Sequence, residues 1–182
     1  MDINSLVNVT SRAWAVPILW SLHAGVAGRQ APLVAATGAG RTAFAQSMDH
    51  LIDAGLMERN PGYGHPLRPE FRLTAKGKAF APLAHRIREA VSDDDLELLR
   101  KSWTLPVLAV LHTPHQFNDL ARALSPITDR ALSQSLKAME ERGWVTRTID
   151  DTARPPRSIY AATGTGKRLS DIIATEVEFP ED

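Results

Sequence analysis

The chain has 182 residues, equal numbers of basic and acidic side chains, and 43% hydrophobic residues. These values are ordinary for a soluble globular protein and argue against a disordered chain. The sequence contains no cysteine, which excludes disulfide scaffolds, thiolate zinc sites and thiol redox switches.

The longest apolar stretches, such as residues 13–22, are much shorter than the roughly 20 residues that a membrane-spanning helix needs. The N-terminus has neither the basic leader nor the small-residue cleavage site of a secretory signal. We therefore expect a cytoplasmic protein with no membrane partner.

A ten-residue segment occurs twice in the chain, 89 residues apart. Residues 14–23 read WAVPILWSLH, and residues 103–112 read WTLPVLAVLH. Further matches follow at shifts of 88 and 89 residues, which indicates single-residue length differences in loops. We therefore expect two domains of one plan. Residues 1–92 hold the first repeat with a long connecting helix, and residues 93–182 hold the second repeat with an acidic tail.

The zero net charge hides an uneven distribution of charged side chains. Residues 1–92 carry 10 Lys/Arg and 6 Asp/Glu, whereas residues 93–182 carry 11 and 15. Eight of the acids lie outside the repeated bodies, namely Asp93, Asp94, Asp95, Glu97, Glu176, Glu178, Glu181 and Asp182. The rest of the chain has a net charge of +8 without them, so the bodies of both repeats are basic.

The first repeat is predicted to contain three helices, a hairpin and a long last helix. The helices are expected over residues 14–23, 33–37 and 41–54, the strands over 56–59 and 70–74, and the last helix over 75–90. Phe44, Met48 and Leu51 form the buried face of the third helix, and Gly55 ends it. The apolar stripe of the last helix exceeds what one small domain needs, so we expect this helix to pack between the repeats.

A short helix over residues 94–101 is expected between the repeats, with Ser92 and Asp93 at its cap. The run from Asp93 to Asp95 lacks the glycine and the terminal glutamate of a calcium loop. We therefore interpret these acids as charge at the start of a helix.

The second repeat follows the same plan. Its helices are expected over residues 103–112, 117–124, 130–142 and about 164–174, and its strands over 144–149 and 158–163. Thr104 is expected to cap the first helix and Thr128 or Asp129 the third, and Gly143 follows the third helix as a suitable C′ residue. Leu132, Leu136 and Met139 form the buried face of that third helix.

Three helices followed by a two-stranded wing form the winged helix-turn-helix, and this chain resembles the HxlR-type bacterial transcription regulators. The motifs that carry the resemblance are WTLPVL at 103–108, FNDL at 117–120, LSQSLK at 132–137, Arg142-Gly143, and Tyr160 to Thr163 with Gly166. Their counterparts in the first repeat lie at residues 14–19, 44–48, 54–56 and 71–77.

The resemblance implies a mainly α fold with small β-hairpins (α+β), built as two tandem winged helix-turn-helix domains that form an intramolecular pseudo-dimer. It also implies a sequence-specific regulator whose partner is double-stranded DNA. Such regulators usually carry one module and dimerise, so this chain is expected to act as a monomeric pseudo-dimer or as a homodimer. Residues 31–36 replace the FNDL pattern in the first repeat, so its grip on DNA is expected to be altered or lost.

A helix-turn-helix places the N-terminal half of its third helix in the major groove. The residues expected on the outward side are Arg130, Ser133, Gln134 and Lys137 in the second repeat, and Arg41, Thr42, Ala45, Gln46 and His50 in the first. Glutamine can bond adenine twice and arginine can do the same for guanine. The base-reading candidates are therefore Gln46, Gln134, Arg41 and Arg130. We expect the DNA site to be asymmetric, with the second repeat binding its half more strongly than the first.

The predicted wings carry cations suited to phosphate or to the minor groove. These are Arg59, His65, Arg68, Arg72, Arg147, Arg154 and Arg157. The alternative is that polar side chains on the third helices and wings are ordinary solvated surface.

Five aromatic side chains have two interpretations. They are Trp14, Trp20, Trp103, Phe117 and Trp144. They either pack in the core and between the repeats, or line a pocket for a flat, apolar small-molecule effector that changes the angle between the two DNA-reading heads.

Other classes of function have weaker support. No nucleophile, base and orienting group occur together, so an enzyme is not expected, and His112 and His115 lack the third ligand of a metal site. No cofactor is expected. Tandem winged helices also serve as protein–protein interaction modules, which is the alternative function. The arginines of the predicted wings argue against that alternative.

Overall fold

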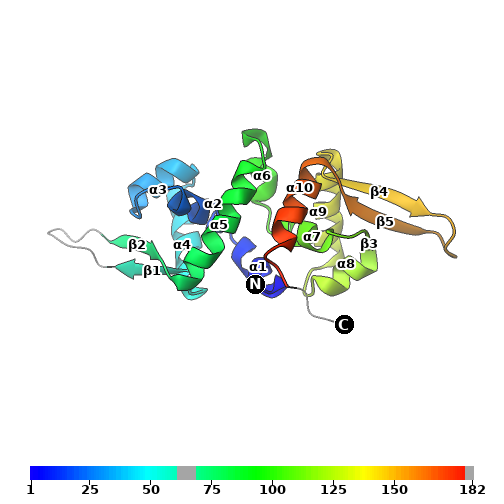
Figure 1. Ribbon diagram of the computed structural model, residues 1–182, viewed down its shortest axis with the longest axis horizontal. Helices are drawn as coiled ribbons and strands as arrows, with labels where there is room; N and C mark the ends of the chain where they lie inside the picture. The colour runs from blue at the N-terminus through cyan, green and yellow to red at the C-terminus, as the bar shows by residue number, and fades with distance from the viewer. Residues whose placement is uncertain (61–68, 179–182) are drawn as a thin grey trace. The chain divides into compact units, whose positions relative to one another are not determined.

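The computed structural model describes residues 1–60 and 69–178 of the chain (Figure 1). These residues form two compact units. The N-terminal unit comprises Asn8–Glu89, and the C-terminal unit comprises Met1–Val7 together with Ala90–Asp182. The first seven residues, which the sequence places with the first repeat, thus pack with the second. No helix in the described part of the chain is long and apolar enough to cross a membrane.

The first helix, α1 (Ile3–Thr10), is absent from the sequence prediction. The side chain of Asp2 caps it, because Oδ1 accepts a hydrogen bond from the Ser5 backbone N–H at 2.8 Å and Oδ2 accepts one from the Ser5 hydroxyl at 2.9 Å. These bonds from Ser5 lower the pKa of Asp2. Ile3, Leu6 and Val9 are buried, which fixes the apolar face of the helix.

The N-terminal unit contains the predicted order of elements. Its helices are α2 (Ala15–His23), α3 (Gln30–Thr37), α4 (Arg41–Asp53) and α5 (Ala75–Glu89), and its hairpin pairs β1 (Met57–Asn60) with β2 (Glu70–Leu73). Helix α2 packs against α5, α3 and α4. Ile18, Leu19, Leu33 and Phe44 are almost completely buried in this core. The expected packing of α5 between the repeats stays a prediction.

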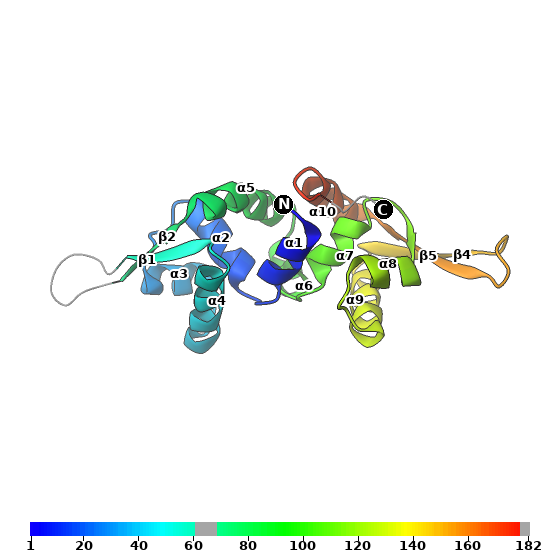
Figure 2. The same cartoon turned by 90° about the horizontal axis from the view of Figure 1, so that it is seen from below.

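The C-terminal unit has the same succession of three helices, a hairpin and a last helix. Its helices are α7 (Thr104–Val110), α8 (Phe117–Ala123), α9 (Asp129–Glu141) and α10 (Gly164–Ala174), and its wing pairs β4 (Val145–Asp150) with β5 (Arg157–Ala162). Helix α7 packs against α10, α9 and α8. Figure 2 shows α8 and α9 beside α7, with the hairpin extending away from the helices of its unit.

The wing sheet of the C-terminal unit has a third strand that was not predicted. Strand β3 (His115–Gln116) pairs antiparallel with β5, with His115 opposite Tyr160. The N-terminal unit makes a corresponding contact without a regular strand, because the Phe71 N–H donates to the Gly28 carbonyl at 2.6 Å. A Cβ on Gly28 would lie 2.0 Å from the Phe71 oxygen, so only glycine fits there.

In each unit, the first turn of the last helix packs closely against the residues that follow the third helix. A Cβ on Gly77 would lie 2.0 Å from the Leu56 carbonyl oxygen, and one on Gly166 would lie 2.1 Å from the Trp144 oxygen. Both glycines therefore allow the same close approach of helix and strand.

Two details of the helix starts differ from the sequence prediction. Thr104 is the first residue of α7 and does not cap it, since its buried hydroxyl donates to the Leu98 carbonyl at 2.7 Å. The single helix expected over residues 94–101 is a 3-10 turn, Asp93–Asp95, followed by the short helix α6 (Leu96–Leu99). The acids from Asp93 to Asp95 stand at this helix start, as predicted, and Asp95 is in addition buried and pairs with Arg142.

Candidate nucleic-acid interface

Helix α9 separates a buried apolar face from an exposed polar face. The Thr128 hydroxyl accepts a hydrogen bond from the Ala131 N–H at 3.2 Å, which confirms Thr128 as its cap. Leu132, Leu136 and Met139 are buried, as predicted. The exposed side chains of the first three turns include the four expected from the sequence, Arg130, Ser133, Gln134 and Lys137, and also Asp129. The helix therefore presents two cations and a glutamine from one regular scaffold.

Helix α4 has the same arrangement with different chemistry. Phe44, Met48 and Leu51 are buried, and the exposed residues are Arg41, Thr42, Ala45, Gln46, Asp49 and Asp53. Gly40 stands at its N-cap position and has no side chain that could cap the helix. At a shift of 88 residues, Asp49 occupies the place of Lys137. The exposed face of α4 is therefore less basic than that of α9.

His50 does not share the exposed face of α4. Its side chain is half-buried, and Nε2 lies 2.8 Å from the Asn8 carbonyl oxygen and 3.4 Å from the Ser11 hydroxyl. This contact joins His50 to the segment that precedes α2, and its role in contacting DNA stays a prediction.

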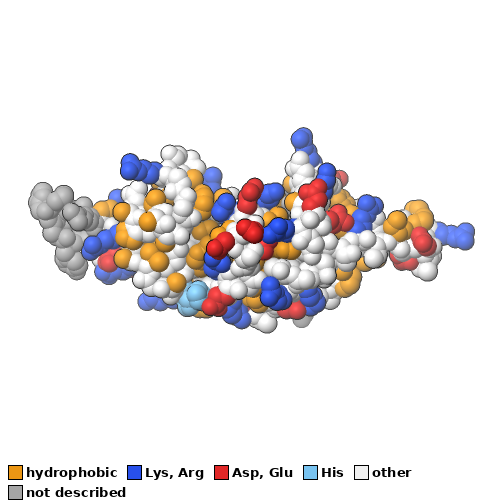
Figure 3. Space-filling view, turned by 90° about the horizontal axis from the view of Figure 1, so that it is seen from above, with side chains coloured by type: hydrophobic (Ala, Val, Ile, Leu, Met, Phe, Trp, Pro, Cys, Tyr) orange, Lys and Arg blue, Asp and Glu red, His pale blue; other side chains and the backbone are white. Residues whose placement is uncertain are grey.

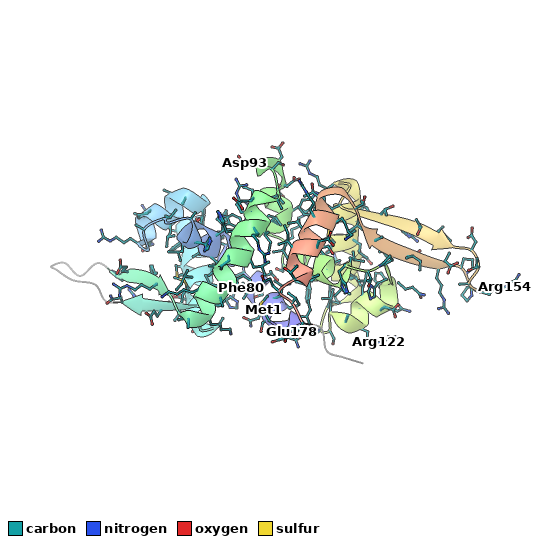
Figure 4. All side chains as sticks on the ribbon, viewed as in Figure 1. Met1, Phe80, Asp93, Arg122, Arg154 and Glu178 are labelled. Atoms are coloured by element: carbon teal, nitrogen blue, oxygen red, sulfur yellow. The ribbon has the colours of Figure 1, made fainter. Side chains whose placement is uncertain are left out.

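The wing of the C-terminal unit carries three exposed arginines. Arg147 donates from Nε and Nη2 to the Ser158 hydroxyl at 2.9 and 2.7 Å, and its guanidinium carbon lies 6.0 Å from the centre of the Tyr160 ring. Arg154 stands at the free end of the hairpin (Figure 4), and Arg157 begins β5. Figure 3 shows basic side chains at this free end.

Asp150 organises the turn at the end of β4. Its Oδ1 accepts hydrogen bonds from the Thr152 hydroxyl at 2.5 Å and from the Thr152 N–H at 3.0 Å. These bonds, with a smaller contribution from the charge of Arg157, lower the pKa of Asp150. The acid therefore serves the turn, while the arginine side chains extend from the hairpin.

The described strands of the N-terminal hairpin carry two arginines and two glutamates. Arg59 is exposed, whereas Arg72 forms an ion pair with Glu70 at 2.6 Å and lies opposite Glu58 in the register of the two strands. His65 and Arg68 lie outside the described residues.

The aromatic residues do not share one environment. Trp144 is almost completely buried, with 2% of its surface exposed. Trp14 and Trp20 of the N-terminal unit, and Trp103 and Phe117 of the C-terminal unit, are half-buried. Trp144 is therefore a core residue of its unit, and the expectation that it binds an effector has no support in its surroundings.

The described residues contain no group of three or more His, Asp or Glu side chains that could hold a metal ion. The exposed faces of α4 and α9 instead offer hydrogen-bond donors from arginine, lysine, glutamine and hydroxyl side chains. Such donors suit phosphate oxygens and base edges.

Comparison with known proteins places this geometry in a family. The model of the HxlR-like helix-turn-helix family matches residues 98–181. Over 91 residues the chain is 30% identical to the uncharacterized HTH-type transcriptional regulator YtfH of Escherichia coli K12, a match that covers 50% of this chain and 71% of YtfH. The chain belongs to the HxlR-like helix-turn-helix family.

A YtfH of Shigella flexneri matches this HxlR-like chain with the same identity and coverage, whereas no solved structure matches it. The residues matched by the HxlR-like family model include α7, α8, α9, the whole C-terminal wing and α10. The family match therefore contains the more basic of the two exposed helix faces.

Proposed function

We propose that this HxlR-like protein is a sequence-specific DNA-binding regulator of transcription, acting in the cytoplasm, and not an enzyme. The observation that carries the proposal is the exposed face of α9, where Arg130, Ser133, Gln134 and Lys137 lie opposite a fully buried apolar face. An α-helix of this kind fits the major groove, which is about 12 Å wide.

Within this proposal the side chains of α9 have separate roles. Gln134 and Arg130 read base edges, because each can form two hydrogen bonds with one base. Lys137 is exposed, and its Nζ lies 3.8 Å from Oε1 of Glu141. It contacts phosphate, because a lysine ammonium is a point charge on a flexible side chain. Arg147, Arg154 and Arg157 of the wing contact the backbone or the minor groove.

We further propose that the two units arose by tandem duplication and act as an intramolecular pseudo-dimer. The repeated succession of elements and the matched close approaches at Gly77 and Gly166 support this proposal. The two heads are unequal, since Asp49 occupies the place of Lys137 in the first repeat. An asymmetric DNA site follows, in which α9 is the stronger reader and Gln46 of α4 contributes less.

The proposal also includes control by a small-molecule effector. The half-buried Trp14, Trp20 and Trp103, with Phe117, are the remaining candidates for contact with a flat, apolar compound. Titration of tryptophan fluorescence with aromatic metabolites tests this part, and an unchanged spectrum with every compound assigns these side chains to packing alone.

Salt dependence separates a DNA-binding regulator from a protein–protein interaction module. Binding of the full chain to a random-sequence duplex should weaken steeply between 50 and 200 mM salt, with the logarithm of affinity falling by roughly 0.9 per neutralised phosphate for each unit of log salt. A chain that binds no duplex at 50 mM salt, or binds it without this slope, would overturn the proposed function.

A further inference from the structure

Ile149 is the only large hydrophobic side chain that is exposed among residues 1–60 and 69–178, with 63% of its surface accessible. It lies on β4, one residue before the turn that Asp150 organises. Val145 is the buried residue of β4, and the positions from Thr146 to Ile149 are exposed. Packing in the core therefore does not require isoleucine at position 149. A β-branched polar residue such as threonine has a similar strand preference.

The register of the wing places Ile149 beside a fixed arginine. Arg147 pairs with Tyr160 and Ile149 pairs with Ser158, and directly paired residues of an antiparallel sheet lie on one face. The hydrogen bonds from Arg147 to the Ser158 hydroxyl cross this face diagonally. Ile149 therefore lies on the same face as Arg147, on the side toward the free end of the hairpin.

The guanidinium of Arg147 is already ordered. Two of its nitrogens share the Ser158 hydroxyl and its carbon lies 6.0 Å from the Tyr160 ring centre. An arginine held in this way loses little conformational freedom when it meets a phosphate. Arg154 is also exposed, at the free end of this hairpin, whereas Arg157 pairs with Asp150 on the opposite face.

This combination matches the chemistry of the minor groove of duplex DNA. The walls of the groove are apolar sugar edges, and phosphates run along both of its rims. Proteins that bind there place arginine in the groove and frequently insert an apolar side chain, isoleucine among them. A protein partner that buried Ile149 would also have to accommodate Arg147 on the same face and Arg154 at the end of the hairpin, which favours a polyanion.

We propose that Ile149 enters the minor groove of bound DNA and packs against its sugar edges, with Arg147 fixed beside it on the phosphate rim. The inference rests on the proposed function and adds to it a residue that improves affinity without carrying charge. The position equivalent to Ile149 at a shift of 88 residues is Pro61, so only the second wing supplies an isoleucine at this place.

The test compares full-length wild-type protein with Ile149→Thr on a duplex that the wild type has selected from random DNA. Ile149→Thr keeps the β-branched shape, and Thr146→Ala, an exposed position on the opposite face of β4, is the matched control. We expect Ile149→Thr to bind about five- to tenfold more weakly, because most of an isoleucine's apolar surface is no longer buried. Thr146→Ala should bind like the wild type.

Two further readouts identify the kind of contact. The salt slope of Ile149→Thr should equal that of the wild type, since no phosphate contact is lost, whereas Arg147→Ala should reduce the slope by about one. Hydroxyl-radical footprinting should show that Ile149→Thr loses protection of sugars in one minor-groove segment only.

Equal affinity and equal footprints for Ile149→Thr and the wild type would overturn the contact while leaving the proposed function in place. Loss of a homodimer in sedimentation, with unchanged DNA affinity, would assign Ile149 to a protein contact and would also overturn it. A wild-type chain that selects no DNA would overturn the proposed function and this inference together.

Discussion

Asp95 accepts a hydrogen bond from Nε of Arg142, and this ion pair ties the turn before α6 to the residue that ends α9. The carboxylate is 9% exposed and also accepts a hydrogen bond from the Ser92 hydroxyl at 2.8 Å. Burial opposes its charged form, but the hydrogen bonds from Ser92 and Arg142 and the charge of Arg142 outweigh burial and lower the pKa of Asp95. The proposed reading helix is therefore anchored at its C-terminal end by a charged contact.

Removing the cation should destabilise the C-terminal unit. Arg142→Met leaves the buried carboxylate of Asp95 with Ser92 as its remaining side-chain donor, and we expect a loss of about 1–3 kcal/mol in the free energy of unfolding. Arg122→Met is the matched control, because Arg122 and Asp119 are both well exposed and lie 3.4 Å apart. It should cost less than about 1 kcal/mol in chemical denaturation. Equal losses of unfolding free energy for the two variants would show that the buried pair of Asp95 and Arg142 stabilises the fold no more than an exposed ion pair does.

The same contact predicts how stability depends on pH. The pKa of Asp95 is lower in the folded protein than its usual value of about 3.9 in an unfolded chain. Its contribution is therefore fully present above the unfolded value and is lost as pH falls through the folded value. The stability difference between the wild type and Asp95→Asn should be constant above about pH 5 and shrink below about pH 4. A difference that grows on acidification would contradict this assignment.

Ser170 offers a stabilising substitution. It is fully buried in α10, and its hydroxyl has no hydrogen-bond partner among the described residues. At a shift of 89 residues the N-terminal unit has the buried Ala81 in its place. Ser170→Ala removes an unsatisfied polar group and should raise the free energy of unfolding by about 1 kcal/mol.

Ser21 is the control for that experiment, since it is also a buried helical serine but donates to the Pro17 carbonyl at 2.8 Å. Ser21→Ala should be neutral or destabilising by about 1 kcal/mol in the same thermal and chemical melts. If Ser170→Ala lowers stability as much as Ser21→Ala does, the Ser170 hydroxyl makes a favourable interaction after all.

Gly166 should not tolerate a side chain. Its Cβ would lie 2.1 Å from a backbone oxygen of Trp144, so α10 must move away from the strand to accept even alanine. We expect Gly166→Ala to cost about 3 kcal/mol or more, whereas Gly40→Ala, with open space around its Cβ, should cost about 1 kcal/mol or less. Circular-dichroism melts of the two variants measure the difference, and similar melting temperatures would refute the close approach.

The sequence predicted the elements that have a strong apolar period. Leu132, Leu136 and Met139 are spaced four and three residues apart, which set the buried face of α9 and hence the exposure of Arg130 and Gln134. The sequence analysis missed helix α1. A signal for this helix was present, because a shift of 89 residues aligns its end with the predicted helix that contains α6. Asp2 followed by Ser5 is a further capping signal for this helix.

Other features depend on contacts between distant segments and leave no local pattern. Strand β3 has two residues and exists only through its pairing with β5. His50 has the spacing of an outward helical residue, but its Nε2 lies 2.8 Å from the Asn8 carbonyl oxygen, 42 residues away. Asp95 was predicted only as charge at a helix start, and its ion pair is with Arg142, 47 residues away. Periodicity cannot report such tertiary contacts.

The most direct test of base reading by α9 compares Gln134→Ala with its matched counterpart Gln46→Ala on the selected duplex and on random duplex. Gln134→Ala should cost about 1–3 kcal/mol of binding free energy on the selected duplex and almost nothing on random DNA. Gln46→Ala should cost less on the selected duplex, because we propose α4 as the weaker reader. An equal loss from Gln134→Ala on both duplexes would contradict the assignment of α9 as the base-reading helix.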